Sequence, residues 1–130
     1  MRRQNIEVVL GFLDAIRRRD REAAAGFLHR EIVWTGVVPD LVCRTPGEVL
    51  DIFLGRRDEQ IEVDRLELIG AEQGAVFAFH RPEIWEVAGI EIRGSMYHAA
   101  EVVDGRITRI NDYADRPEAL AAAELGDQLT

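Results

Sequence analysis

The sequence predicts an α+β fold in which helices pack on one face of a curved, mostly antiparallel sheet. Helical periodicity occupies the first 55 residues and returns at the C-terminal end. Residues 61–113 instead have the pattern of successive strands separated by turn residues. The 130 residues suffice for one hydrophobic core and are too few for two, so we expect a single domain spanning residues 1–130.

Two helices are predicted at the start of the chain. The first covers residues 5–19, where apolar side chains recur at helical spacing, at Ile6, Val9, Leu10, Leu13 and Ile16. Asp20 suits the N-cap of a second, short helix. This second helix is expected to bury three apolar side chains, those of Ala24, Phe27 and Leu28.

A third helix has the clearest start in the sequence. Thr45 can cap it, Pro46 suits the first helical position, and Glu48 completes a capping box. The apolar residues that follow continue until Gly55, where the helix is expected to end. Between the second and third helices we expect a short extended segment at residues 31–35 and a loop at residues 36–44.

Four strands are predicted after the third helix, over residues 61–69, 75–87, 90–103 and 106–114. Asp104 and Gly105 form a two-residue hairpin turn between the last two strands. Gly70 and Gly74 are interpreted as hairpin glycines, since they lack the spacing of a phosphate-binding loop. An Ala-rich helix opens at residues 115–118 and ends the fold.

Composition excludes several classes of chemistry and partner. A formal charge of -8 argues against binding to nucleic acid or to an anionic membrane surface. Every basic residue is Arg, so no lysine can form a Schiff base. Cys43 is the single cysteine, which excludes an internal disulfide and a thiolate zinc cluster. No apolar run has transmembrane or signal-peptide character, and we therefore expect a soluble, cytoplasmic protein.

One face of the predicted strand 75–87 carries the candidate chemistry. Strand alternation places two aromatic residues, an ion pair and a third aromatic residue on that face, namely Phe77, Phe79, Arg81, Glu83 and Trp85. If this face lines a cavity, Arg81 can hold both Glu83 and Asp112 of the last strand. Two bridged carboxylates in different environments make a general acid and a general base. The alternative is a surface ion pair on an edge strand, with Asp112 a solvated charge.

The histidines and the remaining aromatic residues support weaker predictions. His29, His80 and His98 lack a carboxylate cluster at ligand spacing, so no metal site is predicted. His98 is a candidate acid/base helper because histidine titrates near neutral pH. Trp34, like Trp85 and the phenylalanines, is expected in the core or in a pocket wall.

The chain resembles the nuclear-transport-factor-2-like superfamily over nearly its whole length. The resemblance rests on two helices ending in the run 27–34, the third helix after Thr45, and the closing run 104–115. It implies a cone-shaped α+β domain with a deep pocket between the curved sheet and the helices. The superfamily hosts isomerases, cyclases, hydrolases and non-catalytic binders, so the fold alone does not select a function.

Within this superfamily, Arg81 and Glu83 followed by Asp112 look most like limonene epoxide hydrolases. That resemblance implies that Asp112 deprotonates a water, Glu83 protonates the epoxide oxygen, and Arg81 holds both carboxylates. Glu83 stands where the family has an aspartate. Trp34 and Gly36 stand where the family positions its water with a tyrosine and an asparagine.

The chain is also similar to SnoaL-like polyketide cyclases, in which an acidic residue near the Asp112 position is the acid/base. Ketosteroid isomerase fits less well, because Phe12, Thr35 and Ala99 occupy its functional positions. We therefore expect a pocket enzyme, without metal or organic cofactor, that acts on a small apolar metabolite. The function we predict first is epoxide opening. The second is cyclase or isomerase chemistry supported by His98 or Arg81, and the third is a non-catalytic binding domain.

The resemblance also implies a homodimer formed through the exposed face of the sheet. Residues on the opposite phase of the long strands are the candidates to be covered by a partner, namely Val76, Ile84 and Tyr97.

Overall fold

The computed structural model describes residues 2–37, 42–55, 65–80, 84–87, 90–93 and 96–125. Its helices are α1 (Arg2–Arg17), α2 (Arg21–Ala25), α3 (Pro46–Gly55) and α4 (Arg116–Leu125). Its strands are β1 (Leu28–Thr35), β2 (Val42–Cys43), β3 (Arg65–Gly70), β4 (Gly74–His80), β5 (Ile84–Val87), β6 (Ile90–Arg93), β7 (Tyr97–Val103) and β8 (Arg106–Tyr113).

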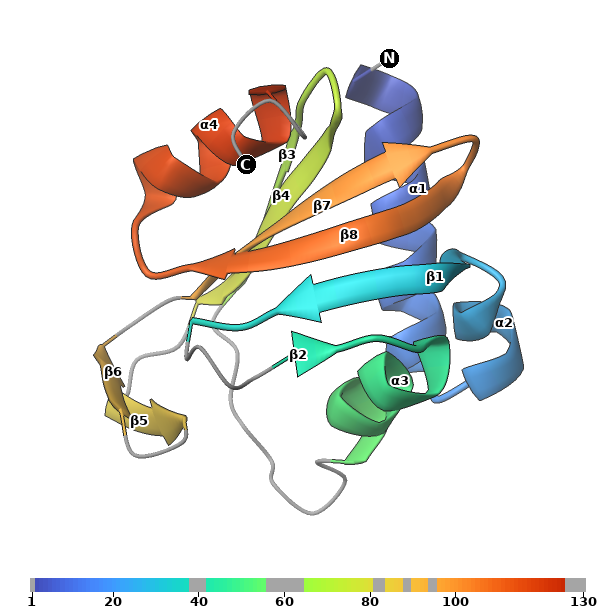
Figure 1. The fold of residues 1–130 in the computed structure, drawn as a ribbon, viewed down its shortest axis with the longest axis horizontal. Helices are drawn as coiled ribbons and strands as arrows, with labels where there is room; N and C mark the ends of the chain where they lie inside the picture. Colours follow the sequence, from blue (N-terminus) through green and yellow to red (C-terminus); the bar gives the residue numbers. More distant parts are fainter. Residues whose placement is uncertain are drawn as a thin grey trace.

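Six strands form the main sheet in the order β2-β1-β8-β7-β4-β3. β1 runs parallel to β8, and the other neighbours in this sheet are antiparallel. β5 and β6 pair separately as a two-stranded sheet. Helix α1 lies behind the main sheet in Figure 1, and α4 lies on its other side. The predicted α+β fold is confirmed.

The local start signals act as predicted. Asp20 caps α2, where its carboxylate accepts a hydrogen bond of 3.0 Å from the backbone N–H of Ala23. At the start of α3, the hydroxyl oxygen of Thr45 accepts from the backbone N–H of Glu48 at 3.1 Å. The Glu48 carboxylate accepts in return from the backbone N–H of Arg44 at 3.1 Å. These bonds satisfy N–H groups that a helix start leaves without partners.

Glycine is required at two of the strand ends. In the hairpin between β7 and β8, Asp104 and Gly105 have φ of 51° and 77°, as a tight turn between twisted strands demands. At the start of β4, a Cβ on Gly74 would lie 1.7 Å from the carbonyl oxygen of Ala100. Any side chain at Gly74 would therefore push β4 away from β7.

The two faces of the main sheet pack differently. The inner face meets α1 and α3. The largest fully buried side chains of this layer include Phe12 of α1 and, from the sheet, Ile32, Phe77, Ile107 and Ile110. The outer face meets α4 through small residues: Val76 and Ala99 of the sheet against Ala119, Ala122 and Ala123.

Four sequence predictions of element bounds need correction. α1 ends at Arg17 instead of residue 19, and Leu10 is 48% exposed, outside its buried stripe. α2 ends at Ala25, so Phe27 and Leu28 lie beyond it and β1 begins three residues earlier than predicted. The short strand β2 lies in the predicted loop 36–44.

The predicted strands 75–87 and 90–103 are each two elements. β4 ends at His80 and belongs to the main sheet, whereas β5 begins at Ile84 and pairs with β6. Pro82 falls between β4 and β5 in the sequence, and a proline cannot donate a ladder hydrogen bond. Because Phe77 and Trp85 belong to different sheets, strand alternation does not assign them to one continuous face.

The surface predicted to meet a partner is partly covered within the chain. Val76 and Tyr97 pack in the cluster formed by α4 on the outer face. The side chain of Ile84 lies outside the described residues. Val76 is buried by this contact and Tyr97 is partly buried, and the homodimer stays a prediction.

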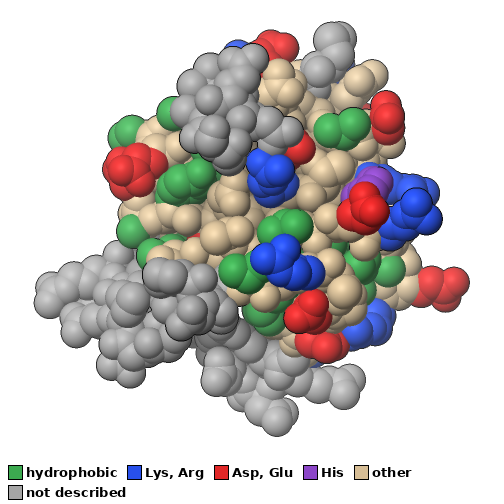
Figure 2. Space-filling model, in the orientation of Figure 1, with side chains coloured by type: hydrophobic (Ala, Val, Ile, Leu, Met, Phe, Trp, Pro, Cys, Tyr) green, Lys and Arg blue, Asp and Glu red, His purple; other side chains and the backbone are tan. Residues whose placement is uncertain are grey.

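Charged side chains of both signs lie on one face of the molecule. On the face viewed in Figure 2, acidic and basic side chains are interspersed with hydrophobic ones. Within the described part of the chain, no helix combines the length and apolar character needed to cross a membrane.

Candidate functional site

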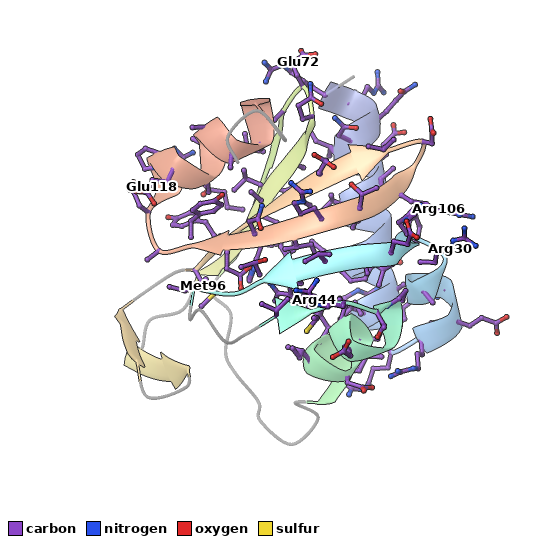
Figure 3. All side chains as sticks on the ribbon, viewed as in Figure 1. Arg30, Arg44, Glu72, Met96, Arg106 and Glu118 are labelled. Atoms are coloured by element: carbon purple, nitrogen blue, oxygen red, sulfur yellow. The ribbon has the colours of Figure 1, made fainter. Side chains whose placement is uncertain are left out.

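Side chains from four strands meet on the inner face of the main sheet. Asp112 lies near the end of β8, directly opposite His98 near the start of β7. His98 in turn lies opposite Phe77 of β4. Trp34, near the end of β1, is paired with Ile110, which shares its face of β8 with Asp112. Met96, labelled in Figure 3 at this end of the sheet, precedes β7 and is also buried.

Two nitrogen atoms contact the same carboxylate oxygen of Asp112. Its Oδ1 accepts a hydrogen bond of 2.8 Å from the indole Nε1 of Trp34. The same Oδ1 lies 2.5 Å from Nδ1 of His98. The Asp112 side chain is only 2% exposed, so these contacts replace the water that a carboxylate would otherwise bind.

The imidazole of His98 lies among aromatic rings. Its centroid is 4.8 Å from that of Phe77, with 30° between the ring planes. The Trp34 ring approaches it edge-on at 6.0 Å. The His98 side chain is 11% exposed, so the polar pair is embedded in an apolar environment that strengthens its mutual interaction.

The donor and acceptor roles follow from the chemistry of the three groups. With Asp112 ionised, its carboxylate accepts hydrogen bonds and cannot donate them, and Nδ1 of His98 is then the donor. Neutral His98 then has its lone pair on Nε2. Among the described residues, no group forms a hydrogen bond with Nε2. The arrangement is chemically able to accept a proton at Nε2 and to stabilise the resulting imidazolium with Asp112.

Helices α1 and α3 support the Trp34 side of the site. The Trp34 ring stacks on Phe53 of α3, with centroids 4.9 Å apart and 21° between the planes. Phe53 packs edge-on against Phe12 of α1 at 5.3 Å. The capping box at the start of α3 therefore helps to place the ring that holds Trp34.

Cys43 lies beside the site but is not a reactive thiol. It is buried, and its backbone pairs with that of Trp34 across β1 and β2. Burial raises the pKa of the Cys43 thiol, and the nearby charges of Glu48 and Asp112 raise it further. A thiol that stays protonated near neutral pH is a poor nucleophile.

The structure brings together four of the eight sequence-predicted site residues: Trp34, Phe77, His98 and Asp112. Arg81 and Glu83 lie outside the described residues, and so do the side chains of Phe79 and Trp85. The predicted bridge from Arg81 to the two carboxylates thus stays a prediction. In the described ranges, no group of three His, Cys, Asp or Glu side chains is arranged to hold a metal ion.

Two features of the site were not predicted from the sequence. The first is the direct contact between His98 and Asp112. A regular ladder from the turn at residues 104–105 would place His98 opposite Asn111, and a one-residue shift at Glu101 and Val102 places it opposite Asp112. The second is the hydrogen bond of Trp34, which lies in the core as predicted and donates its N–H to Asp112.

Sequence comparison finds no matching family model and no matching curated protein. Solved structures are similar in fold. A nuclear-transport-factor-2-like protein from Burkholderia xenovorans aligns over 95% of this chain and 97% of its own, with 20% identity and a TM-score of 0.68. An LEH-like epoxide hydrolase from Mycobacterium tuberculosis aligns over 92% and 91%, with 21% identity and a TM-score of 0.55.

A protein from Xanthomonas campestris, described as a polyketide cyclase, aligns over 95% of this chain and 98% of its own. Its identity is 17% and its TM-score 0.59. At these identities the comparisons establish the fold and leave the chemistry to the site itself. The chain has the nuclear-transport-factor-2-like fold, as its sequence predicts.

Proposed function

We propose that the protein is an acid/base enzyme acting on a small, largely apolar molecule, with His98 and Asp112 as its proton-transferring pair. The observation that supports this is the 2.5 Å contact between Asp112 Oδ1 and His98 Nδ1, made within an aromatic environment. A base whose second nitrogen is anchored by a carboxylate is oriented and stays effective after it takes up a proton. The proposed reaction requires no metal or organic cofactor.

The reaction that fits this pair best is proton transfer at a carbon next to a carbonyl group. Nε2 of His98 takes the proton from that carbon, and the electron pair of the broken C–H bond moves to the carbonyl oxygen. In a β,γ-unsaturated ketone the resulting dienolate takes the proton back from Nε2–H at its far carbon. In a dicarbonyl compound the enolate carbon instead attacks the second carbonyl carbon, and the alkoxide oxygen that forms takes the proton from Nε2–H. The first outcome is an isomerisation and the second a cyclisation. Arg81 is our candidate for stabilising the enolate oxygen.

Hydrolysis of an epoxide is the second candidate. Asp112 Oδ2 has no hydrogen-bond partner among the described residues, so it is chemically able to take a proton from water. In this reaction Glu83 protonates the epoxide oxygen and Arg81 holds both carboxylates. We place it second because the Trp34 N–H is already bonded to Asp112 and Gly36 has no side chain, which leaves neither free to hold a water.

Deuterium exchange tests the first candidate. A panel of small alkyl and aryl ketones is incubated with the protein in D₂O, and loss of the α-proton signal is followed by NMR. We expect exchange above the uncatalysed rate, reduced about 10²–10⁴-fold by His98→Gln. His29→Gln is the matched control, since His29 is a histidine on β1 whose Nδ1 only accepts from the backbone N–H of Glu31. Exchange that is equal in wild type and His98→Gln would contradict the proposal.

Oxygen-18 water separates the second candidate from the first. A panel of terpene and alkyl epoxides is incubated in labelled water, and the products are analysed by mass spectrometry. A diol with one labelled oxygen, in the absence of ketone exchange, would replace the first candidate with the second. If neither assay shows turnover, the enzymatic proposal is wrong and a non-catalytic binding domain is favoured.

A further inference from the structure

We infer that Trp34 is the positioning residue of this site: its indole N–H fixes the direction of the hydrogen bond between Asp112 and His98, and so makes Nε2 of His98 the proton acceptor. The hydrogen-bond direction is inferred from the contact geometry and from the donor and acceptor chemistry of the three groups. The catalytic consequence rests on the proposed function.

Trp34 and His98 contact the same oxygen of Asp112. An indole N–H is a donor without acceptor capacity, so Oδ1 of Asp112 must accept from Trp34. His98 Nδ1 meets the same Oδ1. An Oδ1 that carries no proton can accept from Trp34 and from His98 together, because a carboxylate oxygen has two lone pairs. In that state Nδ1 must be the donor.

Without the Trp34 N–H, the hydrogen bond between Asp112 and His98 has a second possible direction. The pair could then take up one proton from solvent at Nε2 while the hydrogen on Nδ1 moves to Oδ1, so that the carboxyl group donates and Nδ1 accepts. Neutral His98 would then carry its single hydrogen on Nε2 and lose the lone pair that abstracts a proton. The Trp34 N–H therefore determines which nitrogen atom of the His98 imidazole is basic.

The indole ring of Trp34 is held in place by its neighbours. Trp34 is buried, stacked on Phe53 and paired through its backbone with Cys43 and Ile110. These contacts fix the indole ring, so its N–H has no other direction available. If Trp34 only lined a pocket, the shape of its ring would matter and its N–H would not.

An isosteric analogue separates these two roles. β-(Benzothiophen-3-yl)alanine keeps the size and shape of tryptophan but has sulfur in place of the N–H. The chain has two tryptophans. We place the analogue at position 34 alone by codon suppression and keep tryptophan at position 85. Trp34→Phe is a second variant that removes the donor by ordinary mutagenesis, and circular dichroism checks the folding of each.

The primary readout is the ¹⁵N NMR spectrum of the His98 ring, which needs no substrate. We expect neutral His98 in the wild type to carry its hydrogen on Nδ1 and its lone pair on Nε2. The position-34 variant should shift toward the Nε2–H tautomer. An unchanged tautomer in folded position-34 and Trp34→Phe proteins would overturn the inference.

The catalytic consequence is measured in the ketone-exchange assay. Losing one hydrogen bond to a charged group should lower kcat about 10–100-fold and change KM little, because Trp34 acts through Asp112 and not on the substrate. A tautomer change in a wild-type protein that exchanges no ketone would retain the inference and reject the proposed function. Unchanged kcat and tautomer in an active protein would reject the inference and retain the function.

Discussion

The two faces of the main sheet differ in what they bury. The inner face buries large aromatic and β-branched side chains against α1 and α3, whereas the outer face buries alanines of α4 against Val76 and Ala99. The described buried polar side chains are Asn5, His98 and Asp112. Asn5 donates to the carbonyl oxygen of Ala71 and so anchors a turn. The other two lie on the inner face and satisfy each other.

This difference shows where acid/base chemistry is possible in the molecule. Small residues let α4 approach the outer face closely, and that contact contains no buried polar group among the described residues. Large rings on the inner face separate the helices from the sheet and surround a polar pair at one end. The account therefore predicts different responses to substitution on the two faces.

Truncation of adjacent residues on β4 should show the largest difference. Phe77→Ala removes a fully buried inner ring and should lower the free energy of unfolding by about 3–5 kcal/mol. Val76→Ala removes two methyl groups from the outer face and should cost about 2 kcal/mol. Urea unfolding monitored by circular dichroism measures both. Equal losses of unfolding free energy in the two variants would mean that packing against α4 stabilises the fold as much as packing on the inner face. That result would contradict the predicted difference.

Much of this two-faced arrangement is predictable from the sequence. The capping residues Asp20 and Thr45 mark helix starts by local hydrogen bonding, and the turn at residues 104–105 marks the β7–β8 hairpin. Such signals depend on near neighbours in the chain, so pattern alone detects them.

The pairing at the site depends on contacts that are distant in sequence. Trp34 and Asp112 are 78 residues apart, and their contact depends on the parallel pairing of β1 with β8. The His98 register depends on a single-residue irregularity that no composition pattern marks. The division of the strand 75–87 was missed because both halves have strand-like patterns, although Pro82 was a signal available in the sequence.

Removal of the buried carboxylate should have the next largest effect on stability. Asp112→Ala leaves the Trp34 N–H and His98 without their partner and should cost about 1–3 kcal/mol. Asp112→Asn keeps an acceptor oxygen and should cost less. Asp51→Ala is the matched control, because exposed Asp51 pairs with Arg21 at the surface and should cost less than about 1 kcal/mol. Chemical unfolding in which the control costs as much as Asp112→Ala would contradict the buried pair.

Alkaline pH should have the smallest effect and should act on both faces. Burial raises the pKa of Cys43 beside the inner site and of Tyr113 in the outer cluster, where Glu118 adds to the effect. A group with a raised folded-state pKa contributes stability that is present below its unfolded pKa and is lost as the pH rises through its folded pKa. The melting temperature should therefore fall between about pH 8 and pH 10.5.

Cys43→Ala and Tyr113→Phe should each reduce that fall, because each removes one group whose ionisation favours the unfolded chain. Melting curves of the two variants at both pH values measure the effect. A pH dependence identical to that of the wild type in both variants would mean that neither group is protected from ionisation by the fold.

The central claim is that His98 and Asp112 act as one acid/base unit, and a double-mutant cycle in the ketone-exchange assay tests it most directly. We expect His98→Gln and Asp112→Asn each to lower the exchange rate about 10²–10⁴-fold. The double variant should be about as slow as the slower single variant, because residues that act as a unit are not additive. Fully additive losses, or an exchange rate that neither substitution changes, would contradict the claim.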